Sequence, residues 1–204
     1  IKIALLDVVC RVDGVNAGRD AWDWLRPAAV ALRPSKRVIV NNTFIKVLRP
    51  RRNPAEPGST DEGFFGRTIA YREFAFLDGA FGIALEVETT EAAQLIARWM
   101  TGINYLGKRG SFIQITAEPQ ISDILPERYL VVDGNPRPFS LDALLMSLDD
   151  TGDALTFDRV NIYSQERIQL GKHRIFRQTA LPYRVMRSSR GYTEYQLMDE
   201  EQSE

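Results

Sequence analysis

The sequence is nearly without cysteine and histidine: its 204 residues include one of each, Cys10 and His173. A single thiol cannot form an intramolecular disulfide, so a disulfide framework is excluded and a reducing compartment is expected. A metal centre built from several cysteine or histidine ligands is excluded for the same reason. We therefore predict no metal site and no cofactor, and we expect a cytoplasmic protein.

Long apolar runs are also missing. A membrane-spanning helix needs about 18 or more consecutive apolar residues, and no run in this sequence approaches that length. No signal peptide is recognisable, since the chain opens directly on a strand-like run. Apolar residues make up 44% of the chain and charged residues 26%, which suffices for a core under a solvated surface. We predict no interaction with a membrane.

Charge is plentiful but segregated along the chain, although the net charge is only -1. Residues 33–55 and residues 167–190 each contain seven basic side chains and no acidic one. Residues 118–166 contain ten acidic side chains against three arginines. Such segregation favours a surface that binds a polyanion. The alternative is that the basic side chains only cover solvated strand faces.

The pattern of apolar and turn residues predicts the order of the elements in the first 117 residues. The chain begins with a buried strand over 1–12, a helix over 17–33 interrupted by Pro27, and a strand over 36–48. A long exposed loop or hairpin tip over 49–66 leads to two strands within 67–88, which are joined at Asp78-Gly79. A helix that starts at Thr89 or Thr90 and ends at Gly102, and a strand over 111–117, complete this part. The remainder predicts a helix over 141–148 and strands near 156–164, 173–179 and 192–198.

This order predicts an α+β fold of the ferredoxin-like, RRM-like βαββαβ plan, with an insertion near residues 49–66. Residues 1–117 would form this RNA-binding domain, and residues 118–204 a β-rich extension packed on it. The plan is shared by many proteins, so it indicates a fold class and leaves the function to be argued from particular residues.

The connection "NYLGKRGS" between a predicted helix and a predicted strand is the strongest candidate site. Gly107 and Gly110 allow backbone amides to approach a phosphate closely. Lys108 and Arg109 supply charge for phosphate oxygens, and Tyr105 an aromatic face for an unstacked base. The alternative is a glycine-rich turn with solvated charges. The order of residues is not that of a Walker loop, which disfavours nucleotide hydrolysis.

The predicted element order, the mid-chain insertion and "NYLGKRGSF" together resemble the RAMP superfamily of CRISPR-associated proteins, and in particular Cas family five. The resemblance implies a non-catalytic subunit of a Cascade-type, type I-like surveillance complex, which serves antiviral defence by RNA-guided DNA recognition. Its partners would be the 5′ handle of the guide crRNA, the backbone and large subunits, and target DNA through the complex. The RNA-facing loop would contain Leu106, Gly107, Lys108, Arg109 and Ser111.

The same resemblance places residues 46–66 at the family's thumb, an extended hairpin that kinks the RNA handle and meets a neighbouring subunit. Together with the charge pattern, it gives further RNA-binding candidates: Lys46, Arg49, Arg51, Arg52, Arg174 and Arg177. Phe64 and Phe65, flanked by glycines, are candidates for a partner contact. The opening turn "CRVDGVNAGRD" departs from the family's pattern, and the C-terminal half carries no motif that defines a subtype.

Two alternatives from other functional classes remain open. Some members of the family cleave precursor RNA without a metal, which needs a general base and a general acid. His173 with Lys172, Tyr163 or Tyr183 would supply them, although adjacent side chains on a strand point to opposite faces. The other alternative is a protein-interaction subunit without RNA contact, which would dock basic partners on the acidic segment 118–166.

Replacing Lys108 and Arg109 together by alanine is predicted to weaken guide-RNA binding and to flatten its dependence on salt, because phosphate contacts release counterions. Affinity measured across a salt series tests this. An unchanged affinity would remove the loop from the RNA site.

Overall fold

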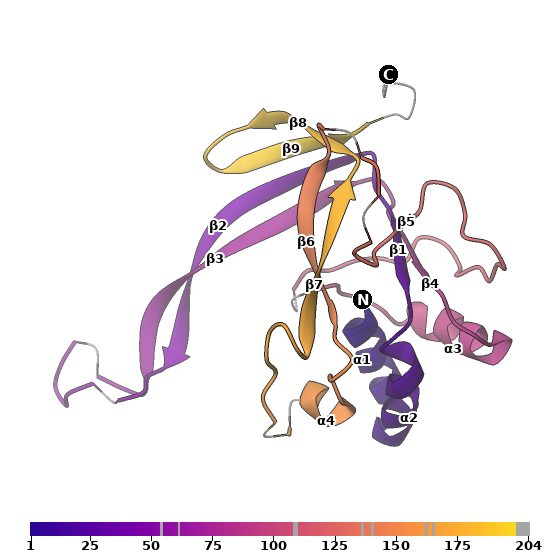
Figure 1. Cartoon of the computed structure of the whole chain (residues 1–204). Helices are drawn as coiled ribbons and strands as arrows, with labels where there is room; N and C mark the ends of the chain where they lie inside the picture. The colour runs from indigo at the N-terminus through magenta and orange to yellow at the C-terminus, as the bar shows by residue number, and fades with distance from the viewer. Residues whose placement is uncertain are drawn as a thin grey trace. The chain divides into compact units, whose positions relative to one another are not determined.

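A computed structural model describes residues 1–198 except Pro54, Asp61, Lys108, Arg109, Pro136, Ser140, Ile162 and Gln165. It is an α+β structure with antiparallel strand pairing, as predicted (Figure 1). The chain divides into two compact units. Unit 1 comprises residues 1–35, 80–184 and those from 197 onward, and unit 2 comprises residues 36–79 and 185–196. The boundary expected at residue 117 falls inside unit 1.

Unit 1 has a core of three helices, and the first of them corrects the sequence analysis. Residues 1–12 were predicted as a strand, but Lys2–Val12 form helix α1. The run is rich in β-branched residues, and a short apolar run does not distinguish a buried strand from a buried helix. Its fully buried residues Leu5, Val8 and Val9 recur at helical spacing, and Arg11 pairs with Asp7 one turn away on the exposed side.

Helix α2 (Val15–Leu25) forms where a helix was predicted but ends before Pro27. Arg26 is the C-cap and is still helical, but Pro27 has no backbone N–H to continue the helical hydrogen bonds, so the helix stops there and the chain continues as strand β1 (Val30–Arg33). Gly18 lies where α1 and α2 meet, and a Cβ at this position would overlap Sγ of Cys10. Trp22, almost fully buried, donates from its ring N–H to the Leu155 carbonyl at 2.7 Å.

Helix α3 (Thr90–Met100) confirms the strongest local prediction. The hydroxyl of Thr89 accepts a hydrogen bond from the Ala92 amide at 3.1 Å, which is the expected N-cap. Ile96 and Trp99 are buried against the other helices. The predicted glycine cap at the other end is wrong: Thr101 is the C-cap, and Gly102 does not adopt a positive φ but packs closely against Val8.

The small sheet of unit 1 has the order β4-β1-β5, with β4 at Gly82–Leu85 and β5 at Leu130–Val131. Strand β4 pairs with β1, not with the strand that precedes it in the chain. The hairpin predicted at Asp78-Gly79 is therefore wrong, although Gly79 does have the positive φ that a tight turn requires. The connection instead joins two different sheets.

A second strand pair of unit 1 consists of β6 (Leu144–Thr151) and β7 (Arg174–Leu181). The prediction of β7 near residues 173–179 is confirmed. The helix predicted over 141–148 is wrong, because pairing with a strand about 30 residues later overrides the local preference of its leucines. Near residues 156–164 a strand was predicted, but the structure has one helical turn, α4 (Phe157–Val160), whose Phe157 joins the core.

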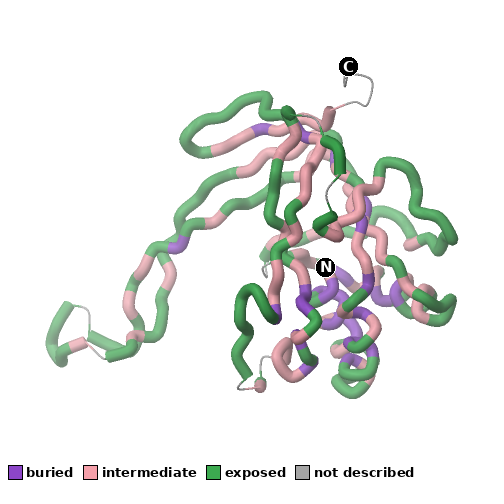
Figure 2. Tube along the Cα trace, in the orientation of Figure 1, coloured by how far each residue is buried: buried purple, intermediate pink, exposed green. Residues whose placement is uncertain are grey.

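Unit 2 is a four-stranded sheet of order β3-β2-β9-β8. Strand β2 (Arg37–Pro50) and strand β3 (Phe65–Asp78) form a long hairpin at the place predicted for strands and an exposed tip. Strands β8 (Tyr183–Ser188) and β9 (Tyr192–Leu197) complete the sheet, and β9 confirms the strand predicted near 192–198. Figure 2 shows that the buried residues gather in the helices of unit 1, while most of the hairpin is exposed.

The ferredoxin-like order depends on strands over 1–12 and 111–117. The first segment is a helix, and the second contains only one isolated bridge, between Tyr105 and Phe112. The helices and antiparallel sheets show the mixed α+β class, but the observed order of the elements does not confirm the ferredoxin-like plan.

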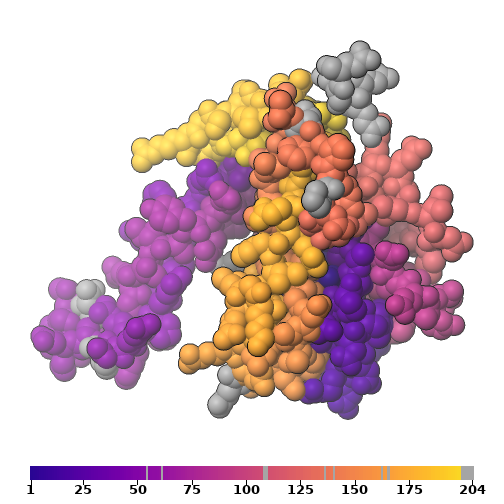
Figure 3. Space-filling model, in the orientation of Figure 1, coloured from indigo at the N-terminus to yellow at the C-terminus, as the bar shows by residue number. Residues whose placement is uncertain are grey.

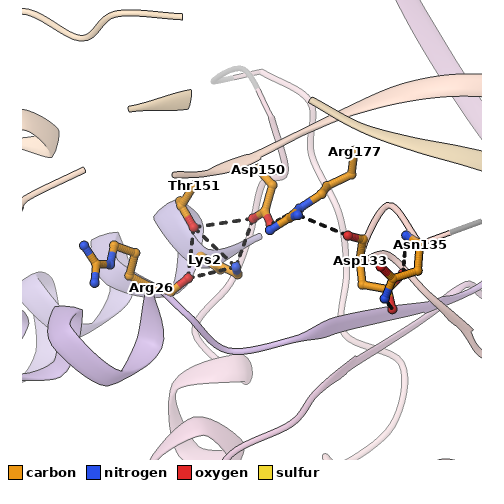
Figure 4. Close-up of polar contacts among 7 residues, drawn as sticks. All are labelled: Lys2, Arg26, Asp133, Asn135, Asp150, Thr151 and Arg177. Carbon is orange, nitrogen blue, oxygen red and sulfur yellow. Dashed lines mark hydrogen bonds and ion pairs between the residues drawn. The ribbon is translucent and has the colours of Figure 1, made fainter. Parts of the chain in front are cut away.

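A buried ion pair ties α1 to the β6–β7 pair (Figure 4). The ammonium of Lys2 lies 2.9 Å from a carboxylate oxygen of Asp150 and donates to the Arg26 carbonyl at 2.8 Å. The other oxygen of Asp150 lies 3.3 Å from Nε of Arg177, whose guanidinium also donates to the Asp133 carbonyl. Burial acts to raise the pKa of Asp150, but the hydrogen bonds from Lys2 and from the Thr151 amide outweigh it and lower that pKa.

We predict that Asp150→Ala lowers the free energy of unfolding by about 3 kcal/mol, since it leaves the buried ammonium of Lys2 unpaired. Denaturant unfolding measures this. The matched control is Asp158→Ala, which removes the exposed pair with Arg19 and should have a much smaller effect. Because the folded pKa of Asp150 is lowered, its contribution is present above the ordinary Asp pKa of about 3.9 and is lost as the pH falls below it. Equal losses in both variants at neutral pH would contradict this account.

Candidate nucleic-acid interface

More than half of the residues in each strand of the β2–β3 hairpin are exposed. Its strands pair without interruption from Arg37 opposite Asp78 to Pro50 opposite Phe65. Strand β9 covers the edge of β2 only as far as Asn41. From Thr43 to Pro50 the ribbon is therefore two strands wide, over roughly 27 Å at about 3.4 Å per residue. Figure 3 shows this part as a narrow arm.

One face of the arm combines aromatic and basic side chains. Directly opposed residues of an antiparallel pair share a face, and alternate residues along each strand do so too. The register therefore gathers on one face a set that we call the aromatic-basic face: Phe44, Lys46, Leu48, Phe65, Arg67, Ile69 and Tyr71.

The aromatic side chains of this face are open to solvent. Tyr71 is 79% exposed and Phe44 is 68% exposed. Their rings meet edge to face with centroids 6.4 Å apart, so they form one aromatic platform. A hollow of about 480 Å³ is lined by Asn42, Thr43, Tyr71, Arg72 and Glu73. Such an exposed apolar surface on a two-stranded ribbon indicates a binding role.

The cations of the arm are available for a ligand. Within the described part of the chain, Lys46, Arg49, Arg52 and Arg67 have no carboxylate within ion-pair distance. Lys46 and Arg67 belong to the aromatic-basic face, while Arg49 and Arg52 lie at the end of β2 and just beyond it. Arg51, also predicted as an RNA contact, packs its side chain against Gly66 across the hairpin. The structure therefore brings four of the predicted residues, Lys46, Arg49, Arg51 and Arg52, into one element.

The base of the hairpin is held by a charged cluster in unit 2. Arg37 donates from Nε to Asp78 at 3.0 Å across the β2–β3 pair, and its guanidinium lies 3.3 Å from Glu194 on β9. Arg187 on β8 donates to the other oxygen of Glu194 at 2.7 Å. The hydrogen bond from Arg187 is the main cause that lowers the pKa of Glu194, so this carboxylate stays ionised between the two guanidiniums. The cluster links all four strands of the sheet.

The glycine loop forms a tight turn in unit 1. The Leu106 amide donates to the Ser111 carbonyl at 3.1 Å, and the Ile113 amide donates to the Asn104 carbonyl at 3.1 Å. Gly107 and Gly110 have φ values of +78° and +98°, which the turn itself requires. Tyr105 is half-buried opposite the exposed Phe112. Lys108 and Arg109 lie outside the described residues, so their predicted role as phosphate contacts stays a prediction.

Arg174 and Arg177 are already paired with carboxylates. Arg174 donates from Nε to Asp149 at 3.1 Å, and Arg177 lies 3.3 Å from Asp150. Both acids belong to the acidic segment 118–166, and the pairing of β6 with β7 brings them next to the basic segment 167–190. Their charge is largely neutralised within the fold, which disfavours both arginines as RNA contacts.

Two residues of the nuclease alternative, His173 and Tyr183, are engaged in the fold, whereas Lys172 and Tyr163 are exposed. His173 is 3% exposed, and its Nδ1 accepts a hydrogen bond from the Gln169 amide at 2.9 Å. Burial, with the nearby charges of Arg159 and Lys172, lowers the pKa of this imidazole. Tyr183 donates its hydroxyl proton to the Ser35 carbonyl at 2.7 Å. Both side chains therefore have structural partners.

Sequence reasoning identified Lys46, Arg49, Arg51 and Arg52 of the arm, and the pair Phe64 and Phe65, whose two rings are exposed in the structure. It missed the members Phe44, Arg67 and Tyr71 of the aromatic-basic face. The alternation of side chains in "FIKVL" and "FGRTIAY" does indicate two strands with two faces. Which side chains of the two strands share a face depends on how the strands pair, and the sequence does not show this pairing.

No family model, curated protein or solved structure matches this chain. Among the helices that the structure describes, none is long and apolar enough to span a membrane. In the same described residues, no three acidic, histidine or cysteine side chains come close enough together to hold a metal ion.

We predict that Phe44→Ala and Tyr71→Ala each change the free energy of unfolding by less than about 1 kcal/mol, since exposed side chains contribute little to stability. Leu5→Ala, in the core, should cost about 2–5 kcal/mol. Denaturant unfolding of the three variants measures this. A loss at Phe44 or Tyr71 comparable to that at Leu5 would mean that these rings are part of a core.

Proposed function

We propose that this chain is an RNA-binding subunit of a ribonucleoprotein complex and that the β2–β3 hairpin is its main RNA contact. The observation that carries the proposal is the aromatic-basic face: exposed rings and unpaired cations alternate on one side of a ribbon two strands wide. Cations bind phosphates and supply affinity, while aromatic faces stack on unpaired bases.

The chemistry of the face favours single-stranded RNA. Bases in a duplex are stacked on one another and leave no free face for Phe44 or Tyr71. In a single strand, the bases and the phosphates are both accessible, so rings and cations spaced along one strand face can contact them in turn. Phe44 and Lys46 stand two residues apart on β2, and Arg67, Ile69 and Tyr71 continue the alternation on β3.

The resemblance to Cas family five gives this activity a specific setting. The hairpin contains residues 46–66, which the resemblance assigns to the family's thumb, and this supports a subunit that caps the 5′ handle of a guide crRNA in a type I-like Cascade complex. It would contact the backbone and large subunits, and target DNA only through the complex. In this role the subunit binds RNA without cleaving it. This proposal rests on the hairpin and does not depend on a ferredoxin-like arrangement of the other elements.

A protein-docking role for the hairpin is the second candidate, because Leu48, Phe65 and Ile69 are exposed on the same face. Aliphatic side chains add little to base stacking but bury well against another subunit. In the thumb setting, a neighbouring protein and the RNA would share the face. Without RNA, the partner would carry acidic groups opposite Lys46 and Arg67.

The test compares two double variants that remove two cations each. Lys46→Ala with Arg67→Ala, which removes the two cations of the aromatic-basic face, should reduce the slope of log affinity against log salt by about 1.4, since each phosphate contact on a single strand contributes about 0.7. The control, Arg11→Ala with Arg19→Ala, removes cations already paired with Asp7 and Asp158 and should leave the slope unchanged. The probe is a short labelled single-stranded RNA of mixed sequence, with duplex RNA as comparison.

Tyr71→Ala should further weaken single-strand binding by about 1–3 kcal/mol while leaving duplex binding unchanged. Equal salt slopes for both double variants, or equal effects of Tyr71→Ala on the two RNAs, would contradict the assignment of the hairpin as the RNA contact.

A further inference from the structure

The aromatic platform of the arm has two polar neighbours, Asn42 and Glu73, which are directly opposed across the β2–β3 pair. Asn42 precedes Phe44 by two positions on β2. Glu73 follows Tyr71 by two positions on β3, so both polar side chains share the face of the two rings. A base stacked on the platform would therefore have an amide and a carboxylate beside one of its edges.

Glu73 is an exception among the acids of this sheet. The strands of unit 2 contain three acids, and the other two, Asp78 and Glu194, are both paired with arginines. Glu73 is exposed, and across the described residues it has no cation within ion-pair distance. A carboxylate on a face that binds phosphates repels the polyanion. Its presence there lowers RNA affinity unless it accepts hydrogen bonds from a base.

The surroundings of these side chains offer space and a fixed backbone. Asn42, Tyr71 and Glu73 all line the hollow of about 480 Å³, which is within the range of about 300–1,000 Å³ typical of small-ligand sites. The Asn42 amide donates to the Gly191 carbonyl at 2.9 Å, so this part of β2 is still held by the β8–β9 hairpin. The polar pair thus projects from the anchored base of the arm, where its position is best defined.

The hydrogen-bonding groups of the pair distinguish among the bases. An ionised carboxylate only accepts hydrogen bonds, and it can accept two side by side. On its Watson–Crick edge guanine presents two adjacent donors, N1–H and N2–H, next to the O6 acceptor. Cytosine and adenine present an amino donor beside a ring nitrogen that accepts, and uracil presents one N–H between two carbonyls. Guanine alone can therefore donate to both oxygens of Glu73 while the Asn42 amide donates to O6.

We propose that this part of the arm is a base-selective subsite for one unpaired guanine of a single-stranded RNA. The guanine stacks on the ring of Tyr71, its N1–H and N2–H donate to the Glu73 carboxylate, and the Asn42 amide donates to its O6. Lys46 and Arg67, on the same face, contact the flanking phosphates. Base selection of this kind rests on the proposed RNA binding and goes beyond it by naming the base that the arm reads.

The test measures the affinity of the full chain for short labelled oligouridines that differ only at a central position, which is guanosine, inosine, adenosine, cytidine or uridine. The guanosine RNA should bind about 5- to 150-fold more tightly than the adenosine, cytidine and uridine RNAs, the range expected for a bidentate contact to a base. Inosine keeps N1–H and O6 but lacks the N2 amino group, so it should lose part of this preference.

The decisive variant is Glu73→Gln, which keeps the shape of the side chain but replaces one acceptor oxygen by a donor. It should abolish the preference for guanosine while the affinity for the uridine RNA stays the same or rises, because a negative charge leaves the face. A misfolded variant would instead lose affinity for every RNA. The matched control is Glu127→Gln, which neutralises an exposed acid of unit 1 and should keep the preference intact.

Equal binding of all five RNAs, a preference for another base, or a guanosine preference that survives Glu73→Gln would overturn the guanine subsite. If Lys46→Ala with Arg67→Ala then still reduces the salt slope, RNA binding by the arm stands and only base selection fails. Binding of none of the RNAs would overturn the proposed function and the subsite together.

Discussion

The exposed hairpin depends on the charged cluster at its base. A two-stranded ribbon has no core of its own and is marginal in water when isolated. Beyond Asn41 the arm has neither a third strand nor a covering helix in the described structure, so its stability comes from cross-strand pairs and from its base. There the ionised Glu194 lies between Arg37 and Arg187 and joins β2 to β8 and β9. This anchor lets the arm carry exposed rings and cations that a self-contained fold would bury or pair.

Charge segregation along the sequence overstates the positive surface of the folded chain. Arg174 and Arg177 belong to one of the two basic segments, yet the β6–β7 register places Asp149 and Asp150 beside them. Arg37 and Arg187 are likewise paired with acids. Among the described residues, cations without a carboxylate within ion-pair distance include Lys46, Arg49, Arg52 and Arg67 of the arm, and Lys172, Arg184 and Arg190 outside it. Ion pairing within the fold therefore selects which part of a basic segment can meet a polyanion.

Local signals in the sequence predicted part of this structure. The cap at Thr89 and the apolar spacing of α3 specify a helix without outside help, and the strands β2, β7 and β9 follow from their residue types. The strand predicted over 1–12 is wrong because this segment packs as a helix against α2. The helix predicted over 141–148 is wrong because this segment pairs as a strand with β7. For the site, the sequence indicates the cations of the arm, but which rings share their face depends on a register between residues about 30 positions apart.

The central claim is that RNA lies along the aromatic-basic face. Ultraviolet crosslinking of the protein to single-stranded RNA, followed by mass spectrometry of the crosslinked peptides, tests it most directly. We predict crosslinks at Phe44 and Tyr71. Crosslinks confined to unit 1, with none on the hairpin, would contradict the account.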